Sequence, residues 1–291
     1  MPTSDLNLLF IINPVSGGKR KTEWAPVIRE YFKTLPHQIE LCVLTGTNDE
    51  DLIRQKIKDC SPDRVVAVGG DGTISLVAKQ LLNTPIVLGI LQGGSANGMA
   101  TELDISPVHK TALDTILNGT VRSIDVVRIN DEDISLHLSD IGLNARIINL
   151  FDRSSKRGMW VYARFFFKVL WQKKLVKVHI KADGLNRTAP VYMIVIANAT
   201  KYGTGAVINP DGRLDDGKFE LVIVHTISLI ELTKMFLSNR SFNPEKVEIF
   251  QTTKATITTK KKIHFQVDGE YKGKVNAVQA AIMPAALRVV T

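Results

Sequence analysis

The stretch VVAVGGDGTISLVAK, residues 65–79, joins an apolar run to a glycine-rich turn with one acid and then to a second apolar pattern. The run Val65–Val68 predicts a buried strand, and the apolar spacing over Ile74–Leu82 predicts a helix. Glycines between a strand and a helix let main-chain N–H groups approach a phosphate closely. Asp71 repels such a phosphate unless a metal ion or a water molecule lies between them. The stretch therefore predicts a strand–turn–helix phosphate site, against the simpler reading of an ordinary flexible turn.

The first 120 residues alternate apolar strands with helical patterns. Strands are predicted over Leu8–Ile12, Ile39–Leu44, Val65–Val68 and Ile86–Leu91. Helices are predicted over Glu23–Lys33, Asp49–Lys58 and Ile74–Leu82. Asn48, with Asp51 three residues later, is the predicted N-cap of the second helix. This alternation predicts a parallel sheet whose ligands bind at the carboxyl ends of its strands.

The pattern changes after Asn118-Gly119, where short strands joined by turns begin. They are predicted over Ile124–Ile129, Ile134–Leu138, Val176–Ile180, Tyr192–Ala197, Phe219–Val224, Ala255–Thr259 and Ile263–Val267. Asp183-Gly184 indicates a hairpin between two of them. A helix is expected from about Met159 to Gln172, whose aromatic residues favour packing over the alternative of an interfacial helix or an acyl-chain wall. A mostly antiparallel second domain is therefore expected from residue 123 onward.

A second glycine-rich turn, LQGGSANGMA at residues 91–100, follows the next predicted strand. Two such turns on successive strand ends favour a shared phosphate site. No Gly-Lys-Ser/Thr completes a Walker A loop, and Ser75 stands where a dinucleotide-binding GxGxxG needs its last glycine. The two turns therefore predict a phosphate site of another kind.

Composition and charge limit the class of protein. The chain has 291 residues, 44% hydrophobic and 23% charged, with a net charge of +8. These values are typical of a soluble globular protein, and the basic excess suits polyphosphates or an anionic membrane surface. Nucleic acid is not an expected partner, because no reader motif is present. Two cysteines and no export signal predict a cytoplasmic location. The basic stretches KLVKVHIK and TTKKKIHF favour solvated strand faces over a membrane-facing stripe.

Five motifs in order resemble the diacylglycerol kinase catalytic family, and the bacterial soluble lipid kinases above all. They are NPVSGG (13–18), GGDGT (69–73), GGSANGMA (93–100), YGTG…NPDGRLDDGKFEL (202–221) and FQVDGE (265–270). The resemblance implies a Rossmann-like α/β nucleotide domain over residues 1–122, to which residues 283–291 return. It also implies an antiparallel β-sandwich lipid domain over residues 123–282, with ATP bound between the two domains.

The resemblance also assigns the nucleotide site. Asp71 is expected near Mg²⁺ and the ATP phosphates, with capping of the following helix as the alternative or additional role. Asn13 and Thr45 are expected on the adenine or ribose side. The remaining nucleotide-binding residues expected by resemblance come from the two glycine loops: Gly69, Gly70, Gly72, Thr73, Gly94, Ser95 and Asn97.

One departure from the family pattern lies in the second loop. Many diacylglycerol kinases place an acid at the end of Gly-Thr-x-Asn-Asp, and this chain has Gly98 there. The Gly-Ser-x-Asn form is more similar to that of sphingosine and ceramide kinases. The departure weakens a prediction of diacylglycerol as the substrate.

Two acidic motifs of the second domain complete the expected site. The resemblance implies that Asp216, with the main-chain carbonyls of Arg213 and Lys218, holds a structural Mg²⁺, where the residues alone indicate a tight turn. It also implies that Glu270 is the general base and Asp268 its close partner, where the residues alone indicate an exposed hairpin turn.

The sequence as a whole predicts an ATP- and Mg²⁺-dependent kinase that phosphorylates a hydroxyl of a membrane lipid at an anionic membrane surface. One alternative is an NAD kinase-like enzyme, which shares GGDGT. Another is a nucleotide- or lipid-binding regulator without activity, which Gly98 favours and the intact Asp71 and Glu270 oppose. The sequence leaves open which lipid is used and whether the chain forms a homodimer.

Overall fold

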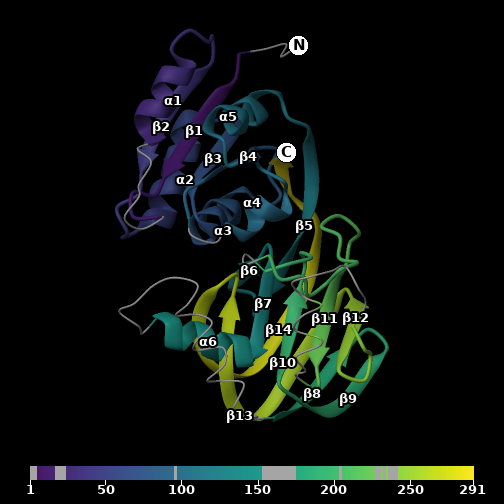
Figure 1. Cartoon of the computed structure of the whole chain (residues 1–291). Helices are drawn as coiled ribbons and strands as arrows, with labels where there is room; N and C mark the ends of the chain where they lie inside the picture. Colours follow the sequence, from purple (N-terminus) through teal and green to yellow (C-terminus); the bar gives the residue numbers. More distant parts are fainter. Residues whose placement is uncertain are drawn as a thin grey trace. The chain divides into compact units, whose positions relative to one another are not determined.

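The computed structural model describes residues 5–16, 24–94, 97–152, 175–202, 205–226, 231, 234 and 242–291. The chain divides into two compact units, Met1–Ile124 with Ala285–Thr291, and Asp125–Pro284. The segment that enters the second unit and the segment that leaves it both belong to long strands, β5 (Val121–Ile129) and β14 (Glu270–Val290) (Figure 1).

The first unit is built on a parallel sheet. Its strands are β1 (Asn7–Ile12), β2 (Gln38–Val43), β3 (Arg64–Gly69), β4 (Val87–Gln92) and the end of β14. They lie in the order β14-β4-β3-β1-β2, and Arg288 and Val289 of β14 pair with Val87 and Leu88. The sheet is expected to be covered on both faces, because β1, β3 and β4 are buried along almost their whole length.

Helices cover that sheet. They are α1 (Trp24–Phe32), α2 (Asp49–Cys60), α3 (Asp71–Leu81), α4 (Gly98–Glu102) and α5 (His109–Asn118). α1 packs against α5, and α2 packs against α3. The predicted strand–helix alternation is therefore confirmed, and α3 begins earlier than the apolar spacing indicates, at Asp71 itself. Its positive N-terminal end thus coincides with the GGDGT motif.

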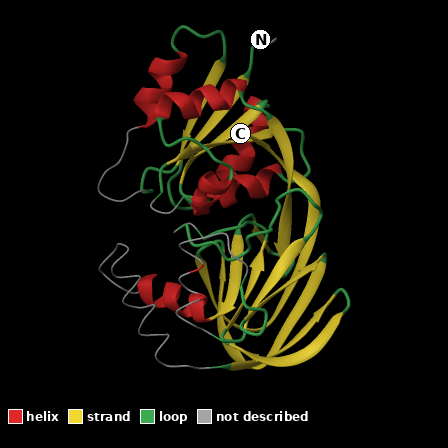
Figure 2. Cartoon of the chain, turned by 45° about the vertical axis from the view of Figure 1, so that its right-hand side comes forward, coloured by secondary structure: helices red, strands yellow, loops and turns green. Residues whose placement is uncertain are grey.

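The second unit is an antiparallel sandwich with one described helix (Figure 2). Its further elements are β6 (Asp133–Ser135), β7 (Leu138–Gly142), α6 (Leu143–Asp152), β8 (Val176–Ala182), β9 (Leu185–Val191), β10 (Met193–Ala197), β11 (Phe219–Val224), β12 (Val247–Thr252) and β13 (Lys254–Val267). The strands follow the order β12-β11-β10-β7-β13-β14, while β8 pairs with β13 and β9, and β5 pairs with β14 and β6. A buried apolar cluster that includes Phe219 and Phe265 fills the space between the layers.

Several local predictions for this unit need correction. The strand predicted over Ile134–Leu138 is two strands, β6 and β7. Asp183-Gly184 does form a hairpin turn, with φ of 74° at Gly184, but it joins β8 to β9, a strand that the sequence pattern did not predict. β12 and α6 were also not predicted. The helix expected over Met159–Gln172 lies outside the described residues.

Asn48 is the N-cap residue of α2, as predicted, but its side chain does not act as a cap. Asn48 has a left-handed backbone, with φ of 54°, and its side chain makes no capping hydrogen bond. Asp49 instead accepts hydrogen bonds from the main-chain N–H groups of Thr45 and Gly46, so the loop before α2 is closed from the helix side. Among the residues that the structure describes, no helix is long and apolar enough to cross a membrane.

Candidate functional site

The two glycine loops contact each other at the carboxyl ends of β3 and β4. The N–H of Gly93 donates to the carbonyl of Gly69 over 2.8 Å. A Cβ atom on Gly94 would lie 2.5 Å from the Cα of Gly70, so only glycine allows the two backbones to come this close. The two turns that the sequence predicts to share a phosphate site therefore lie next to each other.

Asp71 joins the two loops through its carboxylate. Oδ2 accepts a hydrogen bond from the N–H of Gly98 over 2.9 Å, and Oδ1 accepts one from the N–H of Met99 over 3.0 Å. Gly98 and Met99 open α4, so Asp71 caps α4 and not, as the alternative reading proposed, the helix α3 that it begins. A carboxylate offers about four acceptor positions, which leaves room for further ligands beside these two bonds.

Two asparagines order the loops around Asp71. The side-chain amide of Asn13, at the end of β1, donates to Oγ1 of Thr73 over 3.0 Å. Asn97 accepts from the N–H of Gly94 and donates back to its carbonyl, so one residue closes the second loop. Gly72 is exposed in the first turn of α3. Ser95 lies outside the described residues.

Thr45 is exposed after β2, and its hydrogen bonds are local. Its N–H donates to Asp49, and its hydroxyl donates to the carbonyl of Thr47. The structure thus ties Thr45 to the start of α2, while Asn13 is tied to GGDGT. Both follow parallel strands that pair with each other, which puts them on the same edge of the sheet.

The Asp-Gly-Glu motif forms the hairpin between β13 and β14. Asp268 and Gly269 have φ of 45° and 88°, as a two-residue type I′ turn requires. The Asp268 carboxylate accepts hydrogen bonds from the Ser135 hydroxyl and from the N–H groups of Leu136 and His137, at 2.7 to 3.1 Å. Burial raises the pKa of Asp268, and these donors oppose that rise.

Glu270 stands at the exposed end of the same turn. Its side chain is 58% exposed, and one of its oxygens lies 3.4 Å from the ammonium group of Lys272. That ammonium group also contacts Asp133 at 3.0 Å. The two carboxylates of the motif thus engage different partners: Asp268 anchors the turn, and Glu270 extends from it.

A second buried acid supports this turn, and sequence reasoning missed it. Asp140 of β7 accepts hydrogen bonds from the N–H of Ala145 and from the side-chain amides of Asn144 and Gln266. Gln266 in turn accepts a hydrogen bond from the N–H of Gly269. Burial raises the pKa of Asp140 to about 6, and its three N–H donors favour the ionised form. The sequence signal that could have revealed Asp140 is its position as the single acid within the buried strand LSDIG.

The Asp215-Asp216-Gly217 turn lies before β11. Asp216 accepts hydrogen bonds from the N–H of Lys218 and from the amide of Gln251, both at 3.0 Å. The same amide donates to Glu220, whose pKa is raised by burial and also by the negative charges of Asp216 and Asp211. A hard cation would relieve that repulsion. Within the described ranges, however, no group of three or more His, Cys, Asp or Glu side chains is arranged to hold a metal ion.

Asp125, which the sequence reading also missed, fixes this turn from β5. Its carboxylate accepts a hydrogen bond from the N–H of Gly217 over 2.6 Å, and its own N–H donates to the carbonyl of Leu214. Asp125 is buried. Asp125 and Gly217 are 92 residues apart in the chain, so the role of Asp125 in holding the turn is evident only from the folded structure.

Comparison with known proteins shows the family to which the chain belongs. The family model of the diacylglycerol kinase catalytic domain matches residues 7–129, and that of the YegS C-terminal NAD kinase beta sandwich-like domain matches residues 139–291. The second match alone spans more than half of the chain. The chain therefore belongs to the diacylglycerol kinase-like family of lipid kinases, and it is a lipid kinase.

Individual relatives are distant but similar over most of their length. The chain is 28% identical to a Chromohalobacter salexigens protein named "Probable lipid kinase YegS-like", over 92% of this chain and 89% of that one. It is 25% identical to a diacylglycerol kinase of Bacillus subtilis, over 91% and 89%. The crystal structure of a diacylglycerol kinase from Bacillus anthracis shares the fold, with a TM-score of 0.76 at 17% identity, covering 99% of this chain and 97% of that one.

Proposed function

We propose that the protein transfers the γ-phosphate of ATP, with Mg²⁺, to a hydroxyl group of a membrane lipid. The observation that carries the proposal is the Asp71 carboxylate, which holds the two glycine loops together at the carboxyl ends of β3 and β4. Phosphoryl transfer depends mainly on positioning and on neutralising charge. A site of closely packed main-chain groups with one carboxylate suits that task.

Each element of the first unit has a role in the proposal. The glycine loops and the N-terminus of α3 hold the phosphates through main-chain N–H groups. Asp71 holds Mg²⁺ through its remaining acceptor positions, and Mg²⁺ when bound neutralises charge on the phosphate oxygens. Asn13 and Thr45 contact the adenosine part of ATP.

In the second unit, Glu270 accepts the proton of the lipid hydroxyl as the hydroxyl oxygen attacks the γ-phosphorus. The bond from that phosphorus to the β–γ bridging oxygen breaks, and ADP leaves. An alcohol is a very weak acid, so a carboxylate helps only as the proton leaves in the transition state. Asp268 and the pair Asp140 and Gln266 keep the turn that carries Glu270 in place. The exposed position of Glu270 leaves it accessible to a substrate.

The substrate class is tested by comparing acceptors. With labelled ATP and Mg²⁺, the protein is expected to label a long-chain lipid alcohol among diacylglycerol, sphingosine and ceramide, and to leave NAD unlabelled. The Glu270→Gln protein, purified in the same way, controls for contaminating kinases. Labelled NAD without any labelled lipid would overturn the assignment, and no product from any acceptor would favour a non-catalytic regulator.

We also propose that Asp216, with the main-chain carbonyls of Arg213 and Lys218, holds a structural Mg²⁺. The oxygen-only donors fit a hard cation, and the crowding of Asp216 and Glu220 supports one. Added Mg²⁺ without ATP is expected to raise the melting temperature of the parent protein and of the control Asp215→Asn, because a ligand that binds only the folded state stabilises it. Asp216→Asn should show no such rise. An equal rise in the Asp216 variant and the parent, or none in the parent, contradicts the proposal.

A further inference from the structure

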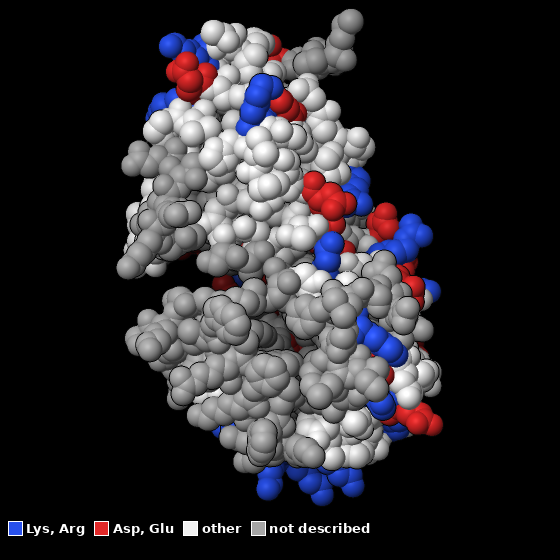
Figure 3. Space-filling view, in the orientation of Figure 1, with Lys and Arg blue, Asp and Glu red and all other residues white. Residues whose placement is uncertain are grey.

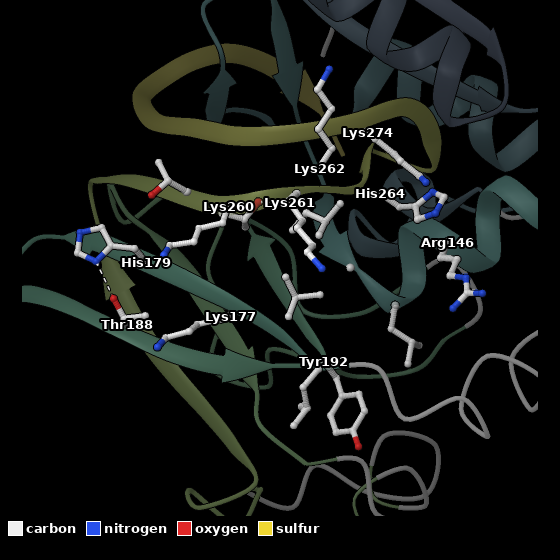
Figure 4. Close-up of a pocket in the computed structure, with 17 residues that line it drawn as sticks. Arg146, Lys177, His179, Thr188, Tyr192, Lys260, Lys261, Lys262, His264 and Lys274 are labelled. Carbon is white, nitrogen blue, oxygen red and sulfur yellow. Dashed lines mark hydrogen bonds between the residues drawn. The ribbon is translucent and has the colours of Figure 1, made fainter.

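A groove on the second unit gathers positive charge. It has a volume of about 1020 Å³ and is lined by β8, β9, β13 and the start of α6. Lys and Arg side chains project at the lower end of this unit in Figure 3, and the groove itself is drawn in Figure 4. Six cations line it: Arg146, Lys177, Lys260, Lys261, Lys262 and Lys274. His179 and His264 join them, and none of the described lining residues is an Asp or Glu.

The secondary structure explains why these cations share one face. In β8, Val178 and Ile180 point into the core, so the alternating residues Lys177 and His179 are exposed. Figure 4 shows Lys177, Lys260 and Lys261 over the strands, Arg146 on α6 with Lys274 of β14 near it, and Lys262 directed away from the others. The groove is thus formed by the outer face of the sheet and by α6.

An irregularity in β13 places three consecutive lysines, Lys260–Lys262, in the lining of the groove. Thr258 pairs with Ala277 of β14 and Ile263 pairs with Val275, so the four residues Thr259–Lys262 stand opposite the single residue Asn276. A bulge of this kind pushes the extra residues out of the ladder and redirects their side chains. Because Thr259 pairs with Val178 on the other side, Lys260 comes next to Lys177.

The charges in the groove are not neutralised from within. In the described part of the chain, none of the six cations forms an ion pair. Two acids of this unit pair with other cations, Asp133 with Lys272 and Glu248 with Arg187. The sequence between Asp152 and Leu175 also contains no Asp or Glu. Like charges placed next to each other destabilise a sheet, so an external anion would stabilise this arrangement.

The lining is apolar as well as basic. Leu143, Val176 and Ile263 contribute, and Leu175 at its edge is 51% exposed. Leu143 and Ile263 are largely buried, so Leu175 and the half-buried Val176 supply the accessible aliphatic surface. Cations beside such aliphatic surface suit the boundary between lipid headgroups and acyl chains better than they suit nucleic acid. We propose that this basic groove binds the phosphate headgroups of anionic lipids in a bilayer. The inference rests on the proposed function, since a kinase of membrane lipids must reach its substrate there.

Vesicle binding tests the groove. The parent, Lys260→Gln/Lys261→Gln and the control Lys33→Gln/Lys58→Gln are sedimented with vesicles of phosphatidylcholine, alone or with phosphatidylglycerol. The lysines of both pairs are exposed, and each double substitution removes two positive charges. Lys33 and Lys58 belong to the first unit. Each lysine near an anionic membrane surface contributes about 1 kcal/mol to the binding free energy. Loss of two lysines therefore predicts roughly 10- to 30-fold weaker binding of the groove variant to anionic vesicles. The control should change by less than about threefold, and melting temperatures should match.

Two further measurements separate this inference from the proposed function. In neutral detergent micelles, which carry no anionic headgroups, the groove variant should phosphorylate the lipid acceptor as fast as the parent. Weakened vesicle binding in a protein that phosphorylates no lipid would uphold the groove and overturn the kinase assignment. The groove proposal would be overturned if the groove variant and the control lost equal affinity for anionic vesicles. It would also be overturned if the groove variant kept its vesicle affinity and instead lost binding to a single-stranded RNA.

Discussion

Replacing Glu270 by glutamine is expected to lower turnover by about 10²–10⁴-fold, because loss of a general base costs that much. The affinity for ATP should stay near that of the parent, since Glu270 is an exposed residue of the β13–β14 turn and its side chain pairs with Lys272 of the same unit. Initial rates with saturating lipid, together with equilibrium binding of an ATP analogue, measure the two quantities separately.

A matched control exists for the loss of charge beside Lys272. Asp133 contacts the same ammonium group at 3.0 Å, where Glu270 lies at 3.4 Å. Asp133→Asn therefore removes a similar ion pair without removing the proposed base, and turnover should stay within about threefold of the parent. If Asp133→Asn is as inactive as Glu270→Gln, the ion pairs of Lys272 matter and Glu270 is not the base. A parallel collapse of ATP binding would make Glu270 a ligand or a structural residue.

Asp71→Asn is expected to lower turnover by more than about a hundredfold, because the variant keeps the shape of the side chain and loses its charge toward the cation. It should also lower the free energy of unfolding by about 1–3 kcal/mol. The reason is that its new amide would face the N–H of Gly98 or of Met99, which now donate to the carboxylate.

The dependence on Mg²⁺ separates the two roles of Asp71. If the residue holds the cation, the Mg²⁺ concentration for half-maximal activity rises in Asp71→Asn. Asn97→Ala serves as the control, because it opens the second loop by removing both bonds to Gly94 and leaves the charge in place. It should lower activity without changing the Mg²⁺ requirement. Turnover of Asp71→Asn comparable to that of the parent would exclude the proposed role.

Local sequence patterns predicted many elements correctly. Apolar runs predicted β1 to β4. The runs of β1, β3 and β4 are apolar on both faces because these strands are buried, whereas β2 is only partly buried. Elements with weaker hydrophobic patterns were not predicted. β9 carries exposed residues at alternate positions and Pro190 within it, and β12 is only partly buried along its length. α6 follows directly on β7; Gly142, with φ of 111°, marks the boundary, but a single glycine does not by itself predict the helix that follows.

The sequence by itself determined the alternating α/β pattern, the β-rich second half, the glycine turns and the family, since each depends on residues close together in the chain or on motifs in a fixed order. Only the tertiary structure decided what the acids contact. Asp71 caps a helix 27 residues away, and Asp268 is held by Ser135, 133 residues away. The alternation of β8 and the bulge of β13 gather lysines from separate segments into one groove. Such contacts follow from strand order and register, which arise when the whole chain packs and which no local pattern encodes.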